Sequence, residues 1–228
     1  MYENGTYLLN NPTWHEEDSA WKAQHVARLL KQNNILPATV CEVGCGAGGV
    51  LQGLAEEFGD GVSFVGYDIS PQAIALCRPK ATARLSFHEK DLFEQATGTY
   101  DVTMAIDVFE HVEDYYGFLR KMRRTGRYKV FHIPLDLSVQ SVLRSAPILH
   151  QRSLVGHLHY FTKETALATL QDTGYEVLDH VYTSSSLDLP NRGWKANLMK
   201  LPRKALSTLN KDLAARVLGG FSLLVLAR

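Results

Sequence analysis

Val40-Cys41-Glu42-Val43-Gly44-Cys45-Gly46-Ala47-Gly48-Gly49 joins a short apolar segment to a glycine-rich loop. The apolar part predicts a strand over 39–43. Apolar residues at helical spacing follow the loop: Leu51, Leu54, Ala55 and Phe58. Glycines allow positive φ angles and let a ligand approach the backbone closely. The start of a helix offers free N–H groups that suit a carboxylate or a phosphate. The stretch therefore predicts a ligand-binding turn between a strand and a helix.

Strands and helices alternate along most of the chain. Further strands are predicted over 63–67, 85–88, 100–106 and 129–133, and the last of these stops at Pro134. Beyond Pro134 we expect helices over 138–146 and from Thr162 through Leu170, with an irregular stretch between them that holds His150, His157 and His159. The last two strands are expected over 175–182 and 221–227. This alternation predicts a parallel sheet covered by helices on both faces.

Four acidic residues lie at or next to predicted strand ends: Glu42, Asp68, Asp91 and Asp107. Ligands of open α/β sheets bind at the carboxyl ends of the strands. A carboxylate such as Asp68 offers two acceptor oxygens and can accept hydrogen bonds from both hydroxyls of a ribose. Asp91 could accept from the exocyclic amine of an adenine, with the backbone N–H of Leu92 directed at the ring. The glycines alone also fit the G-x-G-x-x-G pattern of NAD-binding folds, so an NAD-dependent oxidoreductase stays open.

Several further motifs are typical of one family. They are Glu42-Val43-Gly44-Cys45-Gly46, Gly66-Tyr67-Asp68-Ile69-Ser70, Asp107-Val108-Phe109-Glu110-His111-Val112, His132-Ile133-Pro134 and Gly156-His157-Leu158-His159-Tyr160-Phe161-Thr162. With these motifs, residues 39–228 resemble class I S-adenosylmethionine (SAM) dependent methyltransferases. The last three motifs resemble a subgroup that includes quinone-pathway O-methyltransferases.

The resemblance implies a fold, a cofactor and a reaction. The fold is α/β, a Rossmann-like seven-stranded mixed sheet with helices on both faces and an antiparallel last strand. The cofactor is SAM, whose methyl group passes to a nucleophile by in-line displacement. The expected cofactor-binding residues are Glu42, Gly44, Cys45, Gly46, Asp68, Ile69, Asp91, Leu92 and Asp107. Asp107 is expected to face the methionine half of SAM.

The chain divides into residues 1–38, an N-terminal lid and helix, and residues 39–228, a SAM-binding domain with a basic insertion at about 184–220. A helix is predicted to begin near Ser19, a good N-cap residue. It could simply pack on the sheet edge. Alternatively Trp14, His15, Trp21 and Lys22 could form a lid over the ligand, with Lys22 at the SAM carboxylate.

Methyl transfer to oxygen requires removal of a proton from the acceptor, and histidine suits that role near neutral pH. The candidate catalytic residues are His111 and His157, followed by His159 and His15; each could instead be a packing or capping histidine. Some relatives bind a divalent ion through E-x-x-E-H and a distant histidine. Asp107, Glu110 and His111, with His157 or His159, have the residue types of such a site. Asp107 stands where those relatives have Glu and is expected at SAM, so we expect no metal ligands and keep the metal site as an alternative.

The composition of the chain indicates a cellular compartment and limits the classes of partner. The 228 residues carry no net charge, which makes nucleic acid an unlikely partner. Three cysteines and a polar N-terminus without the plan of a signal peptide favour the cytoplasm. Residues 191–216 carry seven basic residues and one acid, and leucines recur along one predicted helical face that begins at Pro202. This stretch, Arg192 to Arg216, could contact a membrane surface or an anionic substrate, or could be a solvated helix packed across the sheet.

The sequence therefore predicts a SAM-dependent methyltransferase that acts on a small or medium-sized acceptor, at oxygen in the first instance. Nitrogen and carbon acceptors stay open. The alternatives are an NAD-dependent oxidoreductase and a non-catalytic module that binds SAM without turnover.

Overall fold

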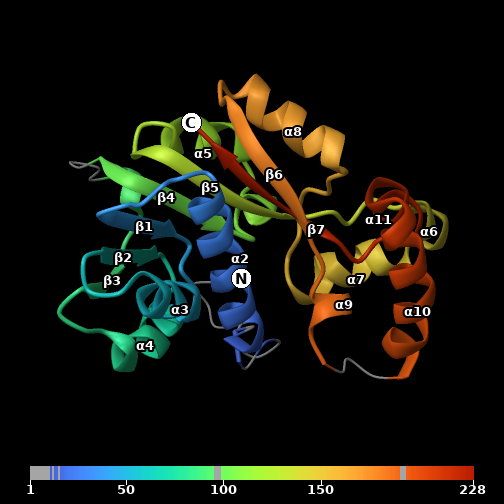
Figure 1. Cartoon of the computed structure of the whole chain (residues 1–228), viewed down its shortest axis with the longest axis horizontal. Coiled ribbons are helices and arrows are strands. Elements are labelled where there is room, and N and C mark those ends of the chain that lie inside the picture. The colour runs from blue at the N-terminus through green and yellow to red at the C-terminus, as the bar shows by residue number, and fades with distance from the viewer. Residues whose placement is uncertain (1–10, 12, 15, 95–98, 191–193) are drawn as a thin grey trace.

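The computed structural model describes residues 11, 13–14, 16–94, 99–190 and 194–228, with the backbone alone for 194–197 and 199 (Figure 1). A seven-stranded sheet crosses the molecule in the order β3-β2-β1-β4-β5-β7-β6. The strands are β1 (Thr39–Val43), β2 (Ser63–Asp68), β3 (Leu85–Glu89), β4 (Tyr100–Ile106), β5 (Gly126–Pro134), β6 (Val177–Thr183) and β7 (Ser222–Ala227).

Strands β1 to β5 are parallel to their neighbours, because the connections between them return the chain to the same end of the sheet. The last strand, β7, enters between β5 and β6 and runs antiparallel to both. Its central residues are fully buried. The predicted fold class is confirmed.

The helices form layers on both faces of the sheet. They are α2 (Ser19–Gln32), α3 (Gly49–Phe58), α4 (Pro71–Cys77), α5 (Tyr115–Met122), α6 (Val139–Arg144), α7 (Ala146–Leu154), α8 (Lys163–Asp172), α9 (Ser185–Asp188), α10 (Trp194–Leu209) and α11 (Lys211–Leu218). Four single-turn 3₁₀ helices add to these: η1 (Glu16–Asp18), η2 (Arg78–Lys80), η3 (Leu92–Glu94) and η4 (Phe109–His111).

Each face of the sheet has its own core. On one face α2 and α3 pack against β1, β4 and β7, and Leu30, Leu51 and Met104 are fully buried there. On the other face α5, α8 and α11 cover β5 and β7. Alternate residues of the central strands supply both cores, which explains their nearly continuous apolar sequence.

Helix starts follow local side-chain chemistry. Ser70 accepts a hydrogen bond from Ala73 N and caps α4, with Pro71 at the first helical position. Thr162 caps α8 by bonding Thr165 N. Ser19, expected as an N-cap, is instead the first residue of α2.

Two predictions about the second half of the chain were wrong. His150 lies in α7 and not in an irregular stretch, because Pro147 starts a helix that the apolar pattern did not mark. The insertion forms two helices, and Pro202 lies within the first. The chain breaks at Asn210, whose side chain accepts a hydrogen bond from Leu213 N and caps α11.

Candidate active site

A cavity of about 560 Å³ opens at the carboxyl ends of the parallel strands. Residues from the glycine loop, from the ends of β1, β2, β4 and β5, and from helices α2 and α7 line it. Predicted site residues among them are Glu42, Gly44, Cys45, Gly46, Asp68, Ile69, Asp107, His111 and His157. The fold therefore brings nine of the eleven predicted site residues to one cavity.

The glycine loop turns sharply at the end of β1. Gly44 has a φ of +72°, and an added Cβ would lie 2.8 Å from Cγ2 of Val108. Gly46 has a φ of +53°, and its Cβ would lie 2.8 Å from Cδ1 of Trp14. Only glycine combines this backbone conformation with so little space. The backbone of the loop thus forms the cavity wall.

Asp68 holds the loop in position from the end of β2. Its Oδ2 accepts a hydrogen bond from Gly46 N at 2.9 Å, and its Oδ1 accepts one from Ser70 N at 2.8 Å. Burial raises the pKa of Asp68, while these backbone donors oppose that rise. Each carboxylate oxygen keeps a second lone pair, which can accept from a ligand hydroxyl.

Glu42 lies at the floor of the cavity, in β1. Its side chain is 2% exposed, and no hydrogen bond within the described chain reaches Oε2. Burial raises the pKa of Glu42 well above its usual range, with Cys77 next in effect, so the site favours the protonated acid. A neutral carboxylic acid can donate one hydrogen bond to a ligand as well as accept.

Asp107, just after β4, is paired on both sides. Lys22 Nζ lies 2.7 Å from its Oδ2, and His132 Nδ1 lies 2.6 Å from its Oδ1. Burial alone would raise the pKa of Asp107, but His132 and Lys22 hold it far below its usual range. Its φ of +54° is rare for a residue with a side chain. His132 in turn bonds Oγ1 of Thr183 at 2.8 Å.

Asp91 and Leu92 lie outside the cavity lining. Asp91 Oδ1 accepts a hydrogen bond from Phe93 N at 2.8 Å, and Leu92 is buried beside Tyr67. They belong to the same edge as Asp68, because Lys90 N donates to the carbonyl of Asp68. Their contact with an adenine stays a prediction.

His111 and His157 both line the cavity, with ring centroids 4.8 Å apart. His157 Nδ1 lies 2.6 Å from Asp136 Oδ2, so this carboxylate fixes the ring. Burial, and then the neighbouring His157, lower the pKa of His111 to about 4. His111 is therefore a neutral imidazole at pH 7.

The other two candidate histidines differ. His159 Nε2 donates to the carbonyl of Val112 at 2.9 Å, and its ring packs on Tyr115, so it lies away from the cavity lining. His15 lies outside the described residues.

Glu110 lies beneath the histidine pair. Its side chain has no exposed surface, and neither carboxylate oxygen makes a hydrogen bond to the described residues. Burial, and then Asp107, raise its pKa well above the usual range. One ligand atom each from Glu110, His111 and His157 lies within 4.8 Å of the others. A nitrogen and oxygen donor set of this kind fits a divalent transition metal. Asp107 and His159, which the sequence also suggested, are engaged elsewhere.

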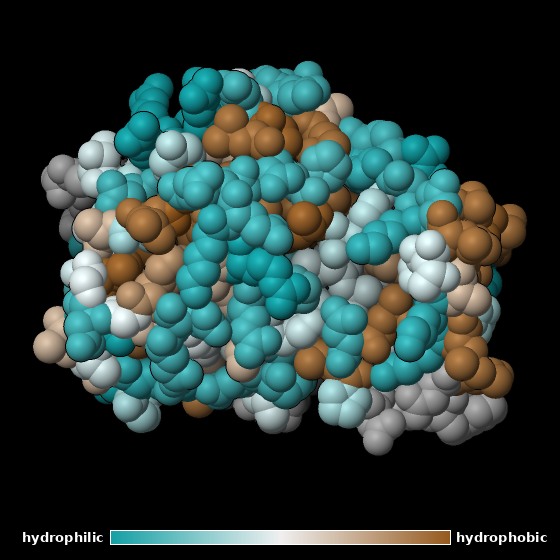
Figure 2. All heavy atoms as spheres, in the orientation of Figure 1, coloured by the Kyte–Doolittle hydropathy of each residue, from teal (hydrophilic) through white to brown (hydrophobic). Residues whose placement is uncertain are grey.

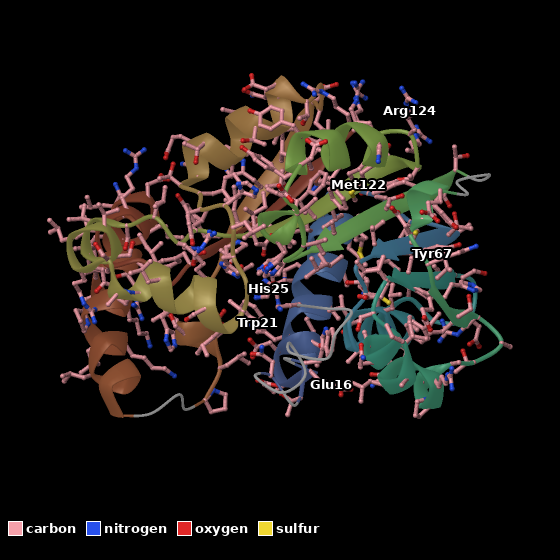
Figure 3. The ribbon with its side chains drawn as sticks, turned by 180° about the vertical axis from the view of Figure 1, so that it is seen from behind. Glu16, Trp21, His25, Tyr67, Met122 and Arg124 are labelled. Atoms are coloured by element: carbon pink, nitrogen blue, oxygen red, sulfur yellow. The ribbon has the colours of Figure 1, made fainter. Side chains whose placement is uncertain are left out.

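The N-terminal segment covers the cavity from the side of α2. Trp14, Trp21 and Lys22 line the cavity, and His15 is not described. Trp21 Nε1 donates to Asp188 Oδ2 at 3.2 Å, which joins α2 to α9. Figure 3 shows Trp21 and His25 on α2, which stands between α3 on one side and α7 on the other. Because α2 also carries fully buried Val26 and Leu30, it both packs on the sheet and lines the cavity.

Sequence reasoning missed several lining residues. His132, Gln151, Val155, Ser185 and Ser222 line the cavity, and Asp136 supports His157. His132-Ile133-Pro134 was noted as a motif, and its position at the end of β5 was a usable signal. The serines come from β7 and α9, whose approach to the cavity depends on the late strand order.

Comparison with known proteins identifies the family. A family model described as "Methyltransferase domain" matches residues 13–180. The chain therefore belongs to the class I SAM-dependent methyltransferase family, as its motifs predicted, and SAM is the cofactor of that family.

Curated relatives differ in what they methylate. The chain is 30% identical over 112 residues to norajmaline N-methyltransferase of Rauvolfia serpentina, which covers 46% of this chain and 38% of that protein. It is 25% identical over 146 residues to ubiquinone biosynthesis O-methyltransferase of Vibrio parahaemolyticus, covering 57% and 60%. In each case the match spans less than two thirds of the relative.

Solved structures share the fold. Magnesium protoporphyrin IX methyltransferase of Synechocystis, with bound S-adenosylhomocysteine (SAH), aligns with a TM-score of 0.62 at 19% identity over 91% of this chain and 82% of that one. A Haloferax volcanii putative methyltransferase in complex with the activator Trm112 gives 0.69 at 16% identity, covering 100% and 96%.

Proposed function

We propose that this protein transfers the methyl group of SAM to an oxygen atom of a small or medium-sized acceptor. The observation that carries the proposal is the cavity itself. The glycine loop, Asp68 and the His111–His157 pair all line it. The glycine loop and Asp68 suit a nucleoside, and the histidine pair suits removal of a proton.

SAM would lie along the glycine loop. The backbone at Gly44, Cys45 and Gly46 approaches it closely, and the free lone pairs of Asp68 accept the ribose hydroxyls beside Ile69. Lys22 and Asp107 face its methionine half, where an ammonium and a carboxylate match the charges of an amino acid. Asp91 and Leu92 are proposed to meet the adenine at the end of β3.

The acceptor would lie between the sulfonium and His157. As the acceptor oxygen attacks the methyl carbon, the carbon–sulfur bond breaks and the proton of the acceptor passes to Nε2 of His157. Asp136 binds Nδ1 of His157, which leaves Nε2 of the same ring free to take the proton. His111 stays neutral and adds no positive charge beside the sulfonium. Trp14 and Trp21 exclude water from the site.

Binding and turnover test this proposal separately. Isothermal titration with SAH and with NADH distinguishes the methyltransferase from an NAD-dependent oxidoreductase; we expect heat of binding only with SAH. A panel of phenols, carboxylic acids, amines and activated carbon acids, assayed with labelled SAM, then identifies the acceptor atom. His157→Gln should lower turnover by about 10² while SAH affinity stays unchanged. SAH binding without transfer to any acceptor would favour the non-catalytic module.

A metal-assisted reaction is a second candidate, favoured by the buried carboxylate of Glu110. Glu110, His111 and His157 would hold the ion, with Asp136 orienting His157. A divalent ion would lower the pKa of an acceptor hydroxyl.

We further propose a small-molecule acceptor and a cytoplasmic location. Two curated relatives are named for norajmaline and for ubiquinone biosynthesis, which supports a small-molecule acceptor here. In the part of the chain that the structure describes, every helix is too short or too polar to cross a bilayer. Cys41, Cys45 and Cys77 are free thiols, which supports a reducing compartment such as the cytoplasm. Membrane-surface contact of Arg192 to Arg216, the lack of a nucleic-acid partner and the division at residue 38 stay predictions.

A further inference from the structure

Exposed aliphatic side chains gather at one end of the molecule. Nine of the thirteen exposed large aliphatic residues in the described chain lie on α6, α7, α10 and α11: Val139, Val142, Leu143, Leu149, Leu154, Leu198, Leu201, Leu209 and Leu213. Leu143, Leu201 and Leu209 are 80%, 75% and 84% exposed. Figure 2 shows hydrophobic atoms along the edge that α6, α10 and α11 form. We call the exposed side of these four helices the α6–α11 surface.

The same four helices are strongly basic, in contrast to the rest of the chain. Their sequences contain eight Lys and Arg residues and one acid, Asp212, a net charge of +7 in a chain whose total is zero. The acid is already paired with Lys163, and among the basic residues only Arg216 forms an ion pair that involves a carboxylate in the described structure, with Glu164. Lys204 and Lys211 are exposed.

We propose that the α6–α11 surface docks on an anionic lipid bilayer. Aliphatic side chains surrounded by basic ones match the two layers of a bilayer interface, acyl chains beneath anionic headgroups. A second copy of this chain fits less well, because the exposed Arg144, Arg152, Lys204 and Lys211 would face the same basic residues of the other copy. A nucleic acid would leave the leucines without apolar partners.

The α6–α11 surface lies next to the cavity, because helix α7 belongs to both. Helix α7 contributes Leu149 and Leu154 to the surface, while Gln151 and Val155 line the cavity. A docked molecule would therefore hold one wall of the cavity close to the bilayer. An apolar acceptor could enter from the lipid, a step that rests on the proposed function.

Vesicle co-sedimentation tests the proposal with the full chain. We expect binding to phosphatidylcholine vesicles that contain 30% phosphatidylglycerol, weak binding to pure phosphatidylcholine, and loss of binding as salt rises. Leu143→Asn/Leu201→Asn/Leu209→Asn and, separately, Lys204→Glu/Lys211→Glu should each weaken binding at least tenfold.

Matched controls lie elsewhere on the molecule. Leu36→Asn changes a leucine that is 81% exposed outside the surface, and Arg120→Glu/Arg124→Glu reverses two exposed charges near α5 (Figure 3). Both should bind vesicles within twofold of the unaltered protein. An equal loss in these controls, or no binding to the anionic vesicles, overturns the proposal. If the unaltered protein does not bind vesicles, forms a dimer in light scattering, and becomes a monomer in the leucine variant, then the surface binds a second copy of the chain instead. SAH titration on the same samples reports the cofactor site independently.

Discussion

Lys22 Nζ lies 2.7 Å from Oδ2 of Asp107, and this ion pair joins helix α2 to the end of β4 inside the cavity. The pair connects two segments that are 85 residues apart in sequence, and it places a cation and an anion where the methionine half of SAM is proposed to bind. Cofactor binding and the position of α2 are therefore expected to depend on each other.

Lys22→Met should weaken SAH binding at least tenfold. The change removes a charge-assisted hydrogen bond, for which 1.5–3 kcal/mol is an order-of-magnitude value. Isothermal titration measures the effect. Lys31→Met is the matched control on the same helix, because Lys31 pairs with Glu57 away from the cavity. Equal affinity in both variants would remove Lys22 from the cofactor site.

Asp68→Asn should lower SAH affinity by at least tenfold. The amide keeps the size of the carboxylate but loses one acceptor oxygen, so it must give up either Gly46 N, Ser70 N or a ribose hydroxyl. Asp60→Asn, at a fully exposed position, is the control. Unchanged titration curves for Asp68→Asn would contradict the assigned role.

Gly44→Ala should destabilise the fold by about 1–3 kcal/mol and abolish SAH binding. The new Cβ would face Val108 in a backbone conformation that side chains disfavour. Gly61→Ala, where the Cβ meets open space, should change stability by well under about 1 kcal/mol. Urea unfolding compares the two, and similar midpoints would show that the glycine loop tolerates side chains.

His111 makes the stability of the protein depend on pH. Its pKa is about 4 in the folded protein against 6.5 for an unperturbed histidine, so the unfolded chain binds the proton more tightly. Stability is therefore lost as pH falls from about 6.5 towards 4. From pH 7 to pH 5 the unaltered protein should lose roughly 2 kcal/mol more than His111→Gln. Urea unfolding of both proteins at the two pH values gives this double difference. A value near zero would show that His111 is not held neutral.

Chelation separates the two candidate mechanisms. If His157 acts as a base, dialysis against EDTA should leave methyl transfer within about twofold of its initial rate, and we expect this result. Loss of activity that Mn²⁺ or Zn²⁺ restores would instead support the metal site. Thermal shift with each ion, compared between the unaltered protein and Glu110→Gln, provides a readout that needs no acceptor.

Most of the fold could be predicted because local signals agree with the tertiary structure. The strand before Gly44 and the caps at Ser70 and Thr162 use short-range chemistry, which is visible in a single sequence. Helix α7 and the break at Asn210 were missed, since neither has a strong apolar period. Packing against neighbouring helices decides such segments.

The two halves of the site also differed in how far the sequence could predict them. Asp68 and the glycine loop follow consecutive strands, so their meeting follows from the βαβ order. Asp136 meets His157 across 21 residues of irregular chain and helix, and no spacing rule joins them. Glu110 was noted for its residue type, but only the structure places its carboxylate where no hydrogen bond reaches it.

Strand β7 lies between β5 and β6, although it follows both in the chain. During synthesis on the ribosome, one edge of β5 therefore stays unpaired, and β6 has no neighbouring strand, until the residues between Thr183 and Ser222 and then β7 itself have emerged. Such a nascent chain exposes the apolar edge of β5 and an unpaired β6 at the same time. We expect a ribosome-bound chain halted before Ser222 to recruit holding chaperones, and one extended through Arg228 and a linker to release them.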